Sequence, residues 1–178
     1  MALKSTIFKA ELSIADMDRG YYTSHNLTLA QHPSETTERM MLRLAAFALH
    51  ASESLAFTKG ISDDGEPDIW QKNYSDEIEI WIELGEPDEK RLRKACGRAR
   101  EVWVYSYGGR SAEIWWQQNG NKYARFANLR VISVHPQILT ELAQLCDRGM
   151  QLTATIQDGH FWLSDAKHNI QVETEVLK

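Results

Sequence analysis

Hydrophobic and polar residues alternate through the first fourteen residues of the chain. The hydrophobic positions of this segment are Phe8, Ala10, Leu12 and Ile14. A period of two over this length is typical of a β-strand with one buried face. A turn-like segment at residues 16–20 and a second extended segment at residues 21–30 follow, so we expect the chain to open with a β-hairpin.

Three other segments have the hydrophobic spacing of amphipathic helices. The first covers residues 34 to about 53, and Ser34 stands where a helix N-cap is expected. The second begins near Pro87, a residue that suits the first position of a helix. The third runs from Pro136 to Arg148 and is closed by Gly149. The pattern therefore predicts about three helices.

Strands are predicted for most of the remaining chain, because short segments rich in β-forming residues lie between turn signals. They are residues 55–61, 68–72, 77–84, 102–107 and 131–134, a hairpin around Asn119-Gly120-Asn121, and a C-terminal tail that turns at Asp158-Gly159. This mixture of strands and helices predicts an α/β fold, with a mixed β-sheet flanked by about three helices. No segment has the composition of a linker, so we expect residues 1–178 to form one compact domain.

The composition narrows the class of protein. The chain has 178 residues, of which 43% are hydrophobic and 25% charged, and this excludes a disordered or collagen-like protein. No run approaches about 18 consecutive apolar residues, and the first residues lack the apolar stretch of a signal peptide. Cys96 and Cys146 lie far apart in the sequence, which fits a reducing compartment. We therefore expect a cytoplasmic protein with no membrane partner.

The distribution of charge changes what the net charge of −5 implies. Taken alone, this value argues against a nucleic-acid partner, because proteins that bind nucleic acids are usually basic. Residues 63–89, however, contain 11 of the 25 acids and a single base, Lys72, whereas residues 90–100 contain six bases and no acid. A metal ion in the acidic segment would reduce its repulsion of phosphate, and the basic segment would attract phosphate. A phosphodiester substrate is therefore compatible with this sequence.

Two carboxylates in the acidic segment are predicted to lie side by side. Alternation through residues 77–84 places Glu83 and Trp81 on one face of a strand, and Asp68 begins the preceding strand. The interval between the acids is long enough for a tight reversal that brings Asp68 beside Glu83. Two carboxylates held close together raise each other's pKa unless a cation lies between them. Two such carboxylates are typical ligands of a hard divalent ion such as Mg²⁺. The ion could polarise a phosphoryl oxygen and generate a hydroxide nucleophile.

These features also have simpler structural interpretations. Glu66-Pro67-Asp68 is common turn chemistry, and Glu35 is an acid that the dipole of the following helix favours. Trp70 and Trp81 are more readily explained as core residues than as base-stacking groups. The six histidines and two cysteines lack the spacing of metal ligands, and we interpret all eight as structural. Tyr107-Gly108-Gly109-Arg110 is a further candidate, as a phosphate-facing loop, although two glycines are a weak signal.

Several motifs match those of known protein families. Pro67-Asp68, a strand bearing Glu83 and a following helix resemble the core of the PD-(D/E)XK nuclease superfamily, over about residues 34–107. A closer resemblance, to the YaeQ family, extends from about residue 3 to residue 177. Its motifs in this chain are Ala15-Asp16-Met17-Asp18-Arg19, His32-Pro33-Ser34-Glu35-Thr36, Arg39-Met40-Met41, Trp81-Ile82-Glu83-Leu84-Gly85 and Lys90-Arg91-Leu92-Arg93-Lys94-Ala95-Cys96-Gly97-Arg98-Ala99. YaeQ proteins are bacterial and are taken to be compact variants of that nuclease fold.

The resemblance implies a metal-dependent, nuclease-like protein that acts on or binds DNA or RNA with Mg²⁺ or Mn²⁺. Asp68 matches the first acid of the motif and Glu83 the second. Glu35 or Glu38 would be the additional acid that some members of the superfamily present from the preceding helix. The motif's lysine should follow its acid by two positions, where this chain has Gly85.

The missing lysine leaves the catalytic cation to be supplied from elsewhere. In the superfamily this lysine positions the attacking water and stabilises the charge that develops on the phosphate. Lys94, one helical turn from Lys90 on the following helix, is the candidate replacement. We also expect basic residues of the helices to hold phosphates, although charged helix faces are usually just solvated; these residues are Arg39, Arg43, Lys90, Arg91 and Arg98. If neither lysine reaches the two acids, the alternative is a non-catalytic interaction or regulatory protein that reuses a nuclease fold.

Overall fold

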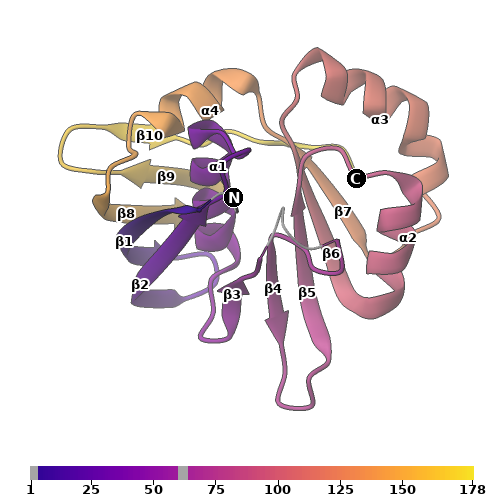
Figure 1. Ribbon diagram of the computed structural model, residues 1–178, viewed down its shortest axis with the longest axis horizontal. Coiled ribbons are helices and arrows are strands. Elements are labelled where there is room, and N and C mark those ends of the chain that lie inside the picture. Colours follow the sequence, from indigo (N-terminus) through magenta and orange to yellow (C-terminus); the bar gives the residue numbers. More distant parts are fainter. Residues whose placement is uncertain (1–3, 60–63) are drawn as a thin grey trace. The chain divides into compact units, whose positions relative to one another are not determined.

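The computed structural model describes residues 4–59 and 64–178 (Figure 1). The chain forms two compact units, each with its own β-sheet. Unit 1 comprises Met1–Ala51 and Gln137–Glu173, and unit 2 comprises Ser52–Pro136 and Thr174–Lys178. The α/β class is confirmed, but the expectation of one mixed sheet is wrong, because the strands divide between two mixed sheets. Among the described residues, no helix is both long and apolar enough to cross a membrane.

Unit 1 contains a five-stranded sheet and two of the described helices. Its elements are β1 (Thr6–Asp16), β2 (Tyr21–Gln31), α1 (Thr37–His50), α4 (Pro136–Ala143), β8 (Gly149–Gln157), β9 (His160–Ser164) and β10 (Asn169–Gln171). The strand order is β10-β9-β8-β1-β2, with β1 parallel to β8 and antiparallel to β2. The predicted hairpin is thus confirmed, and the alternation in β1 buries its hydrophobic face, including Leu12.

Helix α1 begins later than the hydrophobic pattern predicts. Its N-cap is Thr36 and not Ser34, because the hydroxyl of Thr36 accepts a hydrogen bond from the N–H of Arg39 (3.1 Å). The hydroxyl of Ser34 instead bonds the ring of His32 (2.6 Å). Both hydroxyl residues are good N-caps, so the local sequence alone does not decide between them. The helix also ends at His50, earlier than expected.

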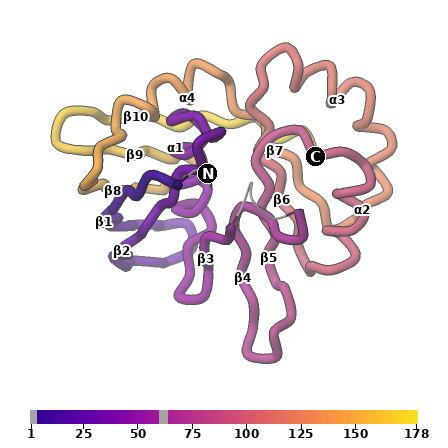
Figure 2. Tube along the Cα trace, viewed as in Figure 1, coloured from indigo at the N-terminus to yellow at the C-terminus, as the bar shows by residue number. Residues whose placement is uncertain are grey.

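Unit 2 contains a six-stranded sheet with the strand order β11-β7-β6-β5-β4-β3. Its elements are β3 (Leu55–Phe57), β4 (Ile69–Lys72), β5 (Ile78–Leu84), α2 (Glu89–Arg98), β6 (Ala99–Ser106), α3 (Arg110–Tyr123), β7 (Leu129–Ser133) and β11 (Glu175–Val176). β5, β6 and β7 are parallel and run side by side, with α2 and α3 as their connections (Figure 2). Trp81, Leu92, Val104, Tyr123 and Val131 belong to the core of this unit.

The hairpin predicted at Asn119-Gly120-Asn121 is wrong, because these residues lie within helix α3. Packing outweighs the local turn signal here: the indole N–H of Trp115 donates to the carbonyl of Pro87 (2.9 Å), and Tyr123 is fully buried. The side chain of Asn119 donates to the carbonyl of Trp115 (2.8 Å), so its amide is satisfied inside the helix. The described residues therefore form four helices, where about three were expected.

The other predicted strands of unit 2 are close to those observed. β4, β5, β6 and β7 overlap the segments predicted as residues 68–72, 77–84, 102–107 and 131–134. Within the described part of the predicted strand 55–61, Leu55–Phe57 is extended and paired, and residues 60 and 61 lie outside the described residues.

Candidate functional site

Asp68 and Glu83 are cross-strand neighbours in unit 2. Asp68 lies directly before β4, whose Ile69 pairs with Ile82 of β5, so the next step of the ladder places Asp68 opposite Glu83. The N–H of Asp68 donates to the carbonyl of Ile82 (3.0 Å), and its Oδ2 accepts from the N–H of Leu84 (2.9 Å). Both acids are buried, each only 5% exposed. The structure thus brings together the two acids that the sequence pairs.

Glu83 is held through one of its two carboxylate oxygens. Its Oε1 accepts hydrogen bonds from Nε1 of Trp81 (2.9 Å) and Nε of Arg91 (2.7 Å). Within residues 4–59 and 64–178, no group donates to Oε2. Burial raises the pKa of Glu83 and the charge of Asp68 adds to this effect, whereas the hydrogen bond and charge of Arg91 oppose it. Water stabilises the charge of this buried carboxylate poorly, so the ionised form of Glu83 depends on its hydrogen bond and ion pair with Arg91.

Two arginines of α2 bind the backbone of residues 64–66. Arg91 donates to the carbonyls of residues 64 and 66 (2.9 and 2.8 Å) while its Nε bonds Glu83. Arg98 donates to the carbonyl of residue 65 (2.8 Å), and its guanidinium lies 5.2 Å from the ring centroid of Trp81. Two of the arginines expected to hold phosphates are therefore engaged in contacts within unit 2.

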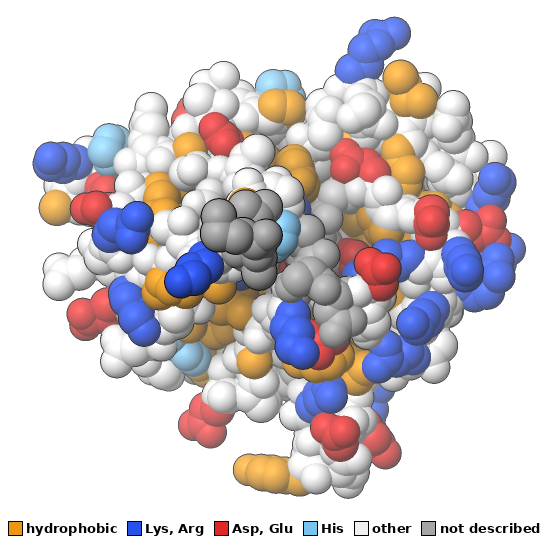
Figure 3. Space-filling model, in the orientation of Figure 1, with side chains coloured by type: hydrophobic (Ala, Val, Ile, Leu, Met, Phe, Trp, Pro, Cys, Tyr) orange, Lys and Arg blue, Asp and Glu red, His pale blue; other side chains and the backbone are white. Residues whose placement is uncertain are grey.

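Lys94 and Lys90, the predicted substitutes for the motif lysine, are exposed on α2, where Lys and Arg side chains gather at the surface (Figure 3). In the part of the chain that the structure describes, neither lysine bonds Asp68 or Glu83. Arg91 does so because it lies in the first turns of α2, four residues before the buried Ala95 and thus beside the apolar stripe of the helix. That spacing is the sequence signal that identifies Arg91 as the residue facing the acids.

Gly85 occupies the motif's lysine position for a backbone reason. Its φ is +113°, a conformation that glycine adopts far more readily than any other residue. Its N–H donates to the carbonyl of Tyr105 on β6 (2.8 Å), so this conformation continues the pairing of the two strands. A lysine here would strain the end of β5.

We expect Gly85→Lys to lower the free energy of unfolding by about 1–3 kcal/mol, the cost of forcing a side chain into such a conformation. A Cβ at this position would lie 4.0 Å from the ring of Tyr107, which is an ordinary contact, so the loss reflects the backbone alone. Urea unfolding measures it. Gly97→Ala is the matched control, because this helical glycine faces open space and alanine there should stabilise by about 0.5–1 kcal/mol. Unchanged stability of Gly85→Lys would contradict this account.

Glu35 lies in unit 1, directly before α1, and forms a buried ion-pair cluster. Its Oε2 accepts from Arg39 (2.8 Å) and from Nε of Arg43 (3.2 Å), and its Oε1 accepts from a second nitrogen of Arg43 (2.8 Å). The resemblance implies that Glu35 is an additional metal ligand, and Arg39 and Arg43 are expected to hold phosphates. In the structure the carboxylate of Glu35 binds both arginines. Glu38, the other candidate, lies in the first turn of α1, where the helix dipole favours an acid.

Within the described residues, no group of three or more His, Cys, Asp or Glu side chains is placed to hold a metal ion. Both cysteines are free thiols. Burial raises the pKa of Cys96 to about 11, and burial also raises the pKa of Cys146. Because a protonated thiol is a poor nucleophile and metal ligand, neither cysteine is a chemical candidate. The candidate metal site therefore consists of Asp68 and Glu83.

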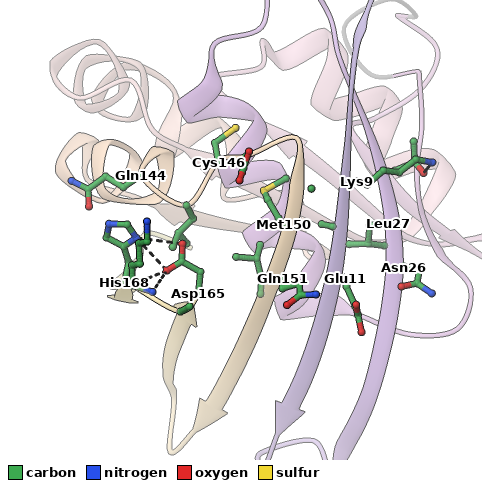
Figure 4. A pocket seen from close by; sticks show the side chains of 18 residues that line it. Lys9, Glu11, Asn26, Leu27, Gln144, Cys146, Met150, Gln151, Asp165 and His168 are labelled. Atoms are coloured by element: carbon green, nitrogen blue, oxygen red, sulfur yellow. Dashed lines mark hydrogen bonds and ion pairs between the residues drawn. The ribbon is translucent and has the colours of Figure 1, made fainter.

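A cavity of about 740 Å³ in unit 1 has no counterpart among the sequence motifs. It is lined by β1, β2, β8, the segment between α4 and β8, and the segment between β9 and β10 (Figure 4). Its lining carries charges of both signs, including Lys9 and Glu11 on β1. On its other side, the Nδ1 of His168 lies 3.2 Å from Oδ1 of Asp165. No sequence motif predicts this cavity, since its walls come from segments far apart in the chain.

Proteins of one family match nearly the whole chain. The family model described as YaeQ protein matches residues 1–174. The proteins named Uncharacterized protein YaeQ from Escherichia coli (strain K12) and Salmonella typhi are 52% and 51% identical to this chain, over 172 and 173 residues. Both matches cover 97% of this chain, and they cover 95% and 96% of those two proteins.

Two crystal structures share the fold of this chain. The YaeQ protein from Xanthomonas axonopodis pv. citri has a TM-score of 0.94 and 48% sequence identity, with 98% of each chain covered. The YaeQ protein from Pseudomonas syringae has a TM-score of 0.93 and 34% identity, with 98% of this chain and 96% of that chain covered. The resemblance of the sequence motifs to the YaeQ family is confirmed, and the chain belongs to the YaeQ family.

Proposed function

We propose that unit 2 binds a divalent metal ion, Mg²⁺ or Mn²⁺, at Asp68 and Glu83 and thereby acts on the phosphodiesters of DNA or RNA. The observation that carries this proposal is the pairing of two buried carboxylates across β4 and β5, with Oε2 of Glu83 bonded by no donor in residues 4–59 and 64–178. The resemblance of these two strands and α2 to the PD-(D/E)XK core supports the same assignment.

The residues present fit such an ion. Mg²⁺ is commonly bound by one or two carboxylates, with water and substrate phosphate completing its ligands. Asp68 and Glu83 supply the two carboxylates. The charge of Asp68 raises the pKa of Glu83, and a cation between the two carboxylates would relieve this repulsion. When bound, the ion would polarise a phosphoryl oxygen and lower the pKa of a water molecule.

The side chains around the two acids have separate tasks in this proposal. Arg91 orients Glu83 through its Nε, and the N–H of Leu84 fixes Asp68. The exposed Lys90 and Lys94 attract the phosphate backbone from α2, instead of taking part in the chemistry. Arg91 is therefore the cation nearest the chemistry, and it takes the place that the resemblance gives to a lysine.

A second candidate function is a non-catalytic protein that binds metal or nucleic acid with the same fold. The specific observation that favours it is the lysine position of the motif, where Gly85 has a φ of +113°. Arg91 also differs from lysine in being always charged and in holding a fixed fork of donors, so it does not exchange protons with a water molecule. Binding without cleavage is the expected behaviour of this candidate.

Metal binding and cleavage are best measured on the same set of variants. Wild-type protein should bind Mn²⁺, followed by its electron paramagnetic resonance, and Asp68→Asn and Glu83→Gln should each weaken binding by more than about tenfold. Glu77→Gln is the matched control, because this acid lies on the same hairpin and its side chain is 60% exposed. Equal Mn²⁺ affinity in wild type and both variants would contradict the proposal.

The second measurement separates the two candidate functions. Pure protein is incubated with single-stranded and double-stranded DNA and RNA in the presence of Mg²⁺ or Mn²⁺. Cleavage by wild type and Glu77→Gln, lost in Asp68→Asn and Glu83→Gln, assigns a nuclease. Metal-dependent nucleic-acid binding without cleavage assigns the non-catalytic function. Cleavage that persists in both acid variants would identify a contaminating enzyme.

A further inference from the structure

The carboxyl ends of β6 and β7 place two serines next to each other in unit 2. Ser106 and Ser133 are the last residues of these parallel strands and are partners in their register. Val104 and Val131, two residues earlier on each strand, pack in the core with side chains of α2 and α3. Because side chains alternate along a strand, both serines face the side of the sheet that these helices cover.

Ser106 is a buried residue at the end of β6. The residue is 1% exposed, and within residues 4–59 and 64–178 its Oγ makes no hydrogen bond. A buried hydroxyl without a hydrogen bond is unfavourable, and native structures keep few of them. The oxygen of a ligand that reached this position would satisfy the hydroxyl.

Helix α3 begins soon after Ser106, and no side chain of the described residues caps its N-terminus. Gly109 is the N-cap, with a φ of +62°, and forms no side-chain cap bond. The N–H of Glu113 donates to the carbonyl of Gly109 (3.0 Å), so the N–H groups of residues 110–112 have no acceptor within the helix. Such groups bind anionic oxygens well. Since α3 covers the face of the sheet that Ser106 faces, its N-terminus lies on the same side of the sheet as this serine.

The loop already holds one anionic oxygen from the same chain. The N–H of Gly108 donates to Oε1 of Glu86 (2.8 Å). A Cβ on Gly108 would collide with this oxygen and would lie 2.6 Å from the hydroxyl of Ser111. Glycine is therefore required for an oxygen to approach the backbone so closely.

We propose that Ser106, Ser133 and the first turn of α3 form a phosphate-binding subsite, which a phosphate enters in place of the carboxylate of Glu86. This rests on the proposed function, since the subsite would anchor a phosphate of the nucleic acid handled at Asp68 and Glu83. Glu83 pairs with Val104 in the register of β5 and β6. Ser106 is thus one diagonal step from Glu83, or about 7–8 Å between Cα atoms. The two sites are close enough to hold neighbouring groups of one substrate.

An NMR titration of ¹⁵N-labelled, metal-free protein with inorganic phosphate tests the subsite. The amides of Gly108, Gly109 and Ser111 should shift and saturate. Ser106→Ala should weaken phosphate binding about three- to tenfold, the loss of one hydrogen bond, and it removes no hydrogen bond of the protein that would threaten folding. Glu86→Gln should strengthen binding, because it removes the charge that competes with phosphate.

Ser75→Ala, in the exposed turn between β4 and β5, is the matched control and should leave the affinity unchanged. Shifts that do not saturate, equal phosphate affinity in Ser106→Ala and wild type, or weaker binding by Glu86→Gln would each overturn the proposal. Asp68→Asn should bind inorganic phosphate as tightly as the wild type. Loss of Mn²⁺ binding then reports on the metal site, and loss of phosphate binding reports on this subsite.

Two short single-stranded DNA molecules, with and without a 5′-phosphate, identify the source of the phosphate. Equal displacement of inorganic phosphate by both assigns the subsite to internal phosphodiesters, as the proposal expects. Displacement by the 5′-phosphorylated DNA alone assigns it to a terminal phosphate of the same substrate. If neither DNA displaces inorganic phosphate, the subsite does not serve a nucleic acid, and the proposal is overturned.

Discussion

Replacing Glu35 with alanine is expected to lower the free energy of unfolding by about 3–5 kcal/mol, the range for removing one partner of a buried ion pair. The carboxylate joins Arg39 and Arg43, whose side chains are 14% and 7% exposed. Its loss would leave two like charges one helical turn apart in a medium that screens them poorly. Urea unfolding of the wild type and the variant measures the difference.

Glu38→Ala is the matched control for this prediction, because Glu38 lies in the first turn of the same helix. Its loss removes a favourable interaction with the helix dipole, worth about 0.3–1 kcal/mol. Equal losses of stability in Glu35→Ala and Glu38→Ala would contradict the ion-pair account. The affinity for Mn²⁺ tests the role that the resemblance implies for Glu35: a ligand would weaken metal binding when replaced, whereas an ion-pair partner of Arg39 and Arg43 would not.

Patterns that one strand or helix expresses by itself were predictable from the sequence. The alternation before residue 16 predicts β1, because one face of this strand is buried and the other is exposed. The pairing of Asp68 with Glu83 was predictable for a related reason. Two short strands joined by a tight turn leave few possible registers, so the residues that flank the turn determine which side chains meet.

Features that depend on packing between distant segments were not predictable in the same way. Asn119-Gly120 is a strong local signal for a hairpin, yet Trp115 and Tyr123 have partners that make a helix more favourable. Both aromatic side chains reach the carbonyl of Pro87, about thirty residues away in the chain. The division of the strands between two sheets has the same origin, since β1 finds its parallel partner in β8, far along the sequence.

The candidate site shows the same distinction. Both acids were identified from the sequence, but Lys94 was proposed as their cation where the structure has Arg91. The two side chains are three residues apart on α2, and only the placement of the helix against β5 decides which of them reaches Glu83. The sequence likewise suggests Glu35 as a metal ligand and does not reveal its ion pairs with arginines. The bond to Arg43 spans eight residues and includes the start of α1.

Arg91→Ala is expected to lower the free energy of unfolding by about 2–3 kcal/mol near pH 8, less than for a fully buried pair because 29% of this side chain is exposed. The substitution removes the Nε hydrogen bond to Glu83 and two bonds to the carbonyls of residues 64 and 66. Glu83 would keep the indole N–H of Trp81, a neutral donor. Urea unfolding in metal-free buffer measures the loss.

The loss should depend on pH, with a sign opposite to that of ordinary acid unfolding. Burial raises the pKa of Glu83, and Arg91 opposes this rise, so its removal raises the pKa in the folded state further above that of the unfolded chain. Between the two pKa values the folded state binds more protons than the unfolded state, and stability falls as the pH rises. The variant's deficit is therefore largest above the folded-state pKa of Glu83 and shrinks as the pH falls through it.

Two further variants assign this pH dependence to Glu83. The double variant Glu83→Gln/Arg91→Ala, compared with Glu83→Gln, should show a deficit independent of pH, because neither of these two proteins contains the titrating group. Arg93→Ala removes an exposed arginine from the same helix, and its deficit should not change between about pH 5 and pH 8, because the pKa of its partner Glu89 is lowered and this acid is ionised throughout that range. A constant deficit in Arg91→Ala between about pH 5 and pH 8 would mean that Arg91 does not change the folded-state pKa of Glu83, and would contradict this account. The charge of Arg91 would then have no effect on the protonation of Glu83, and the hydrogen bonds of Arg91 alone would account for the loss of stability.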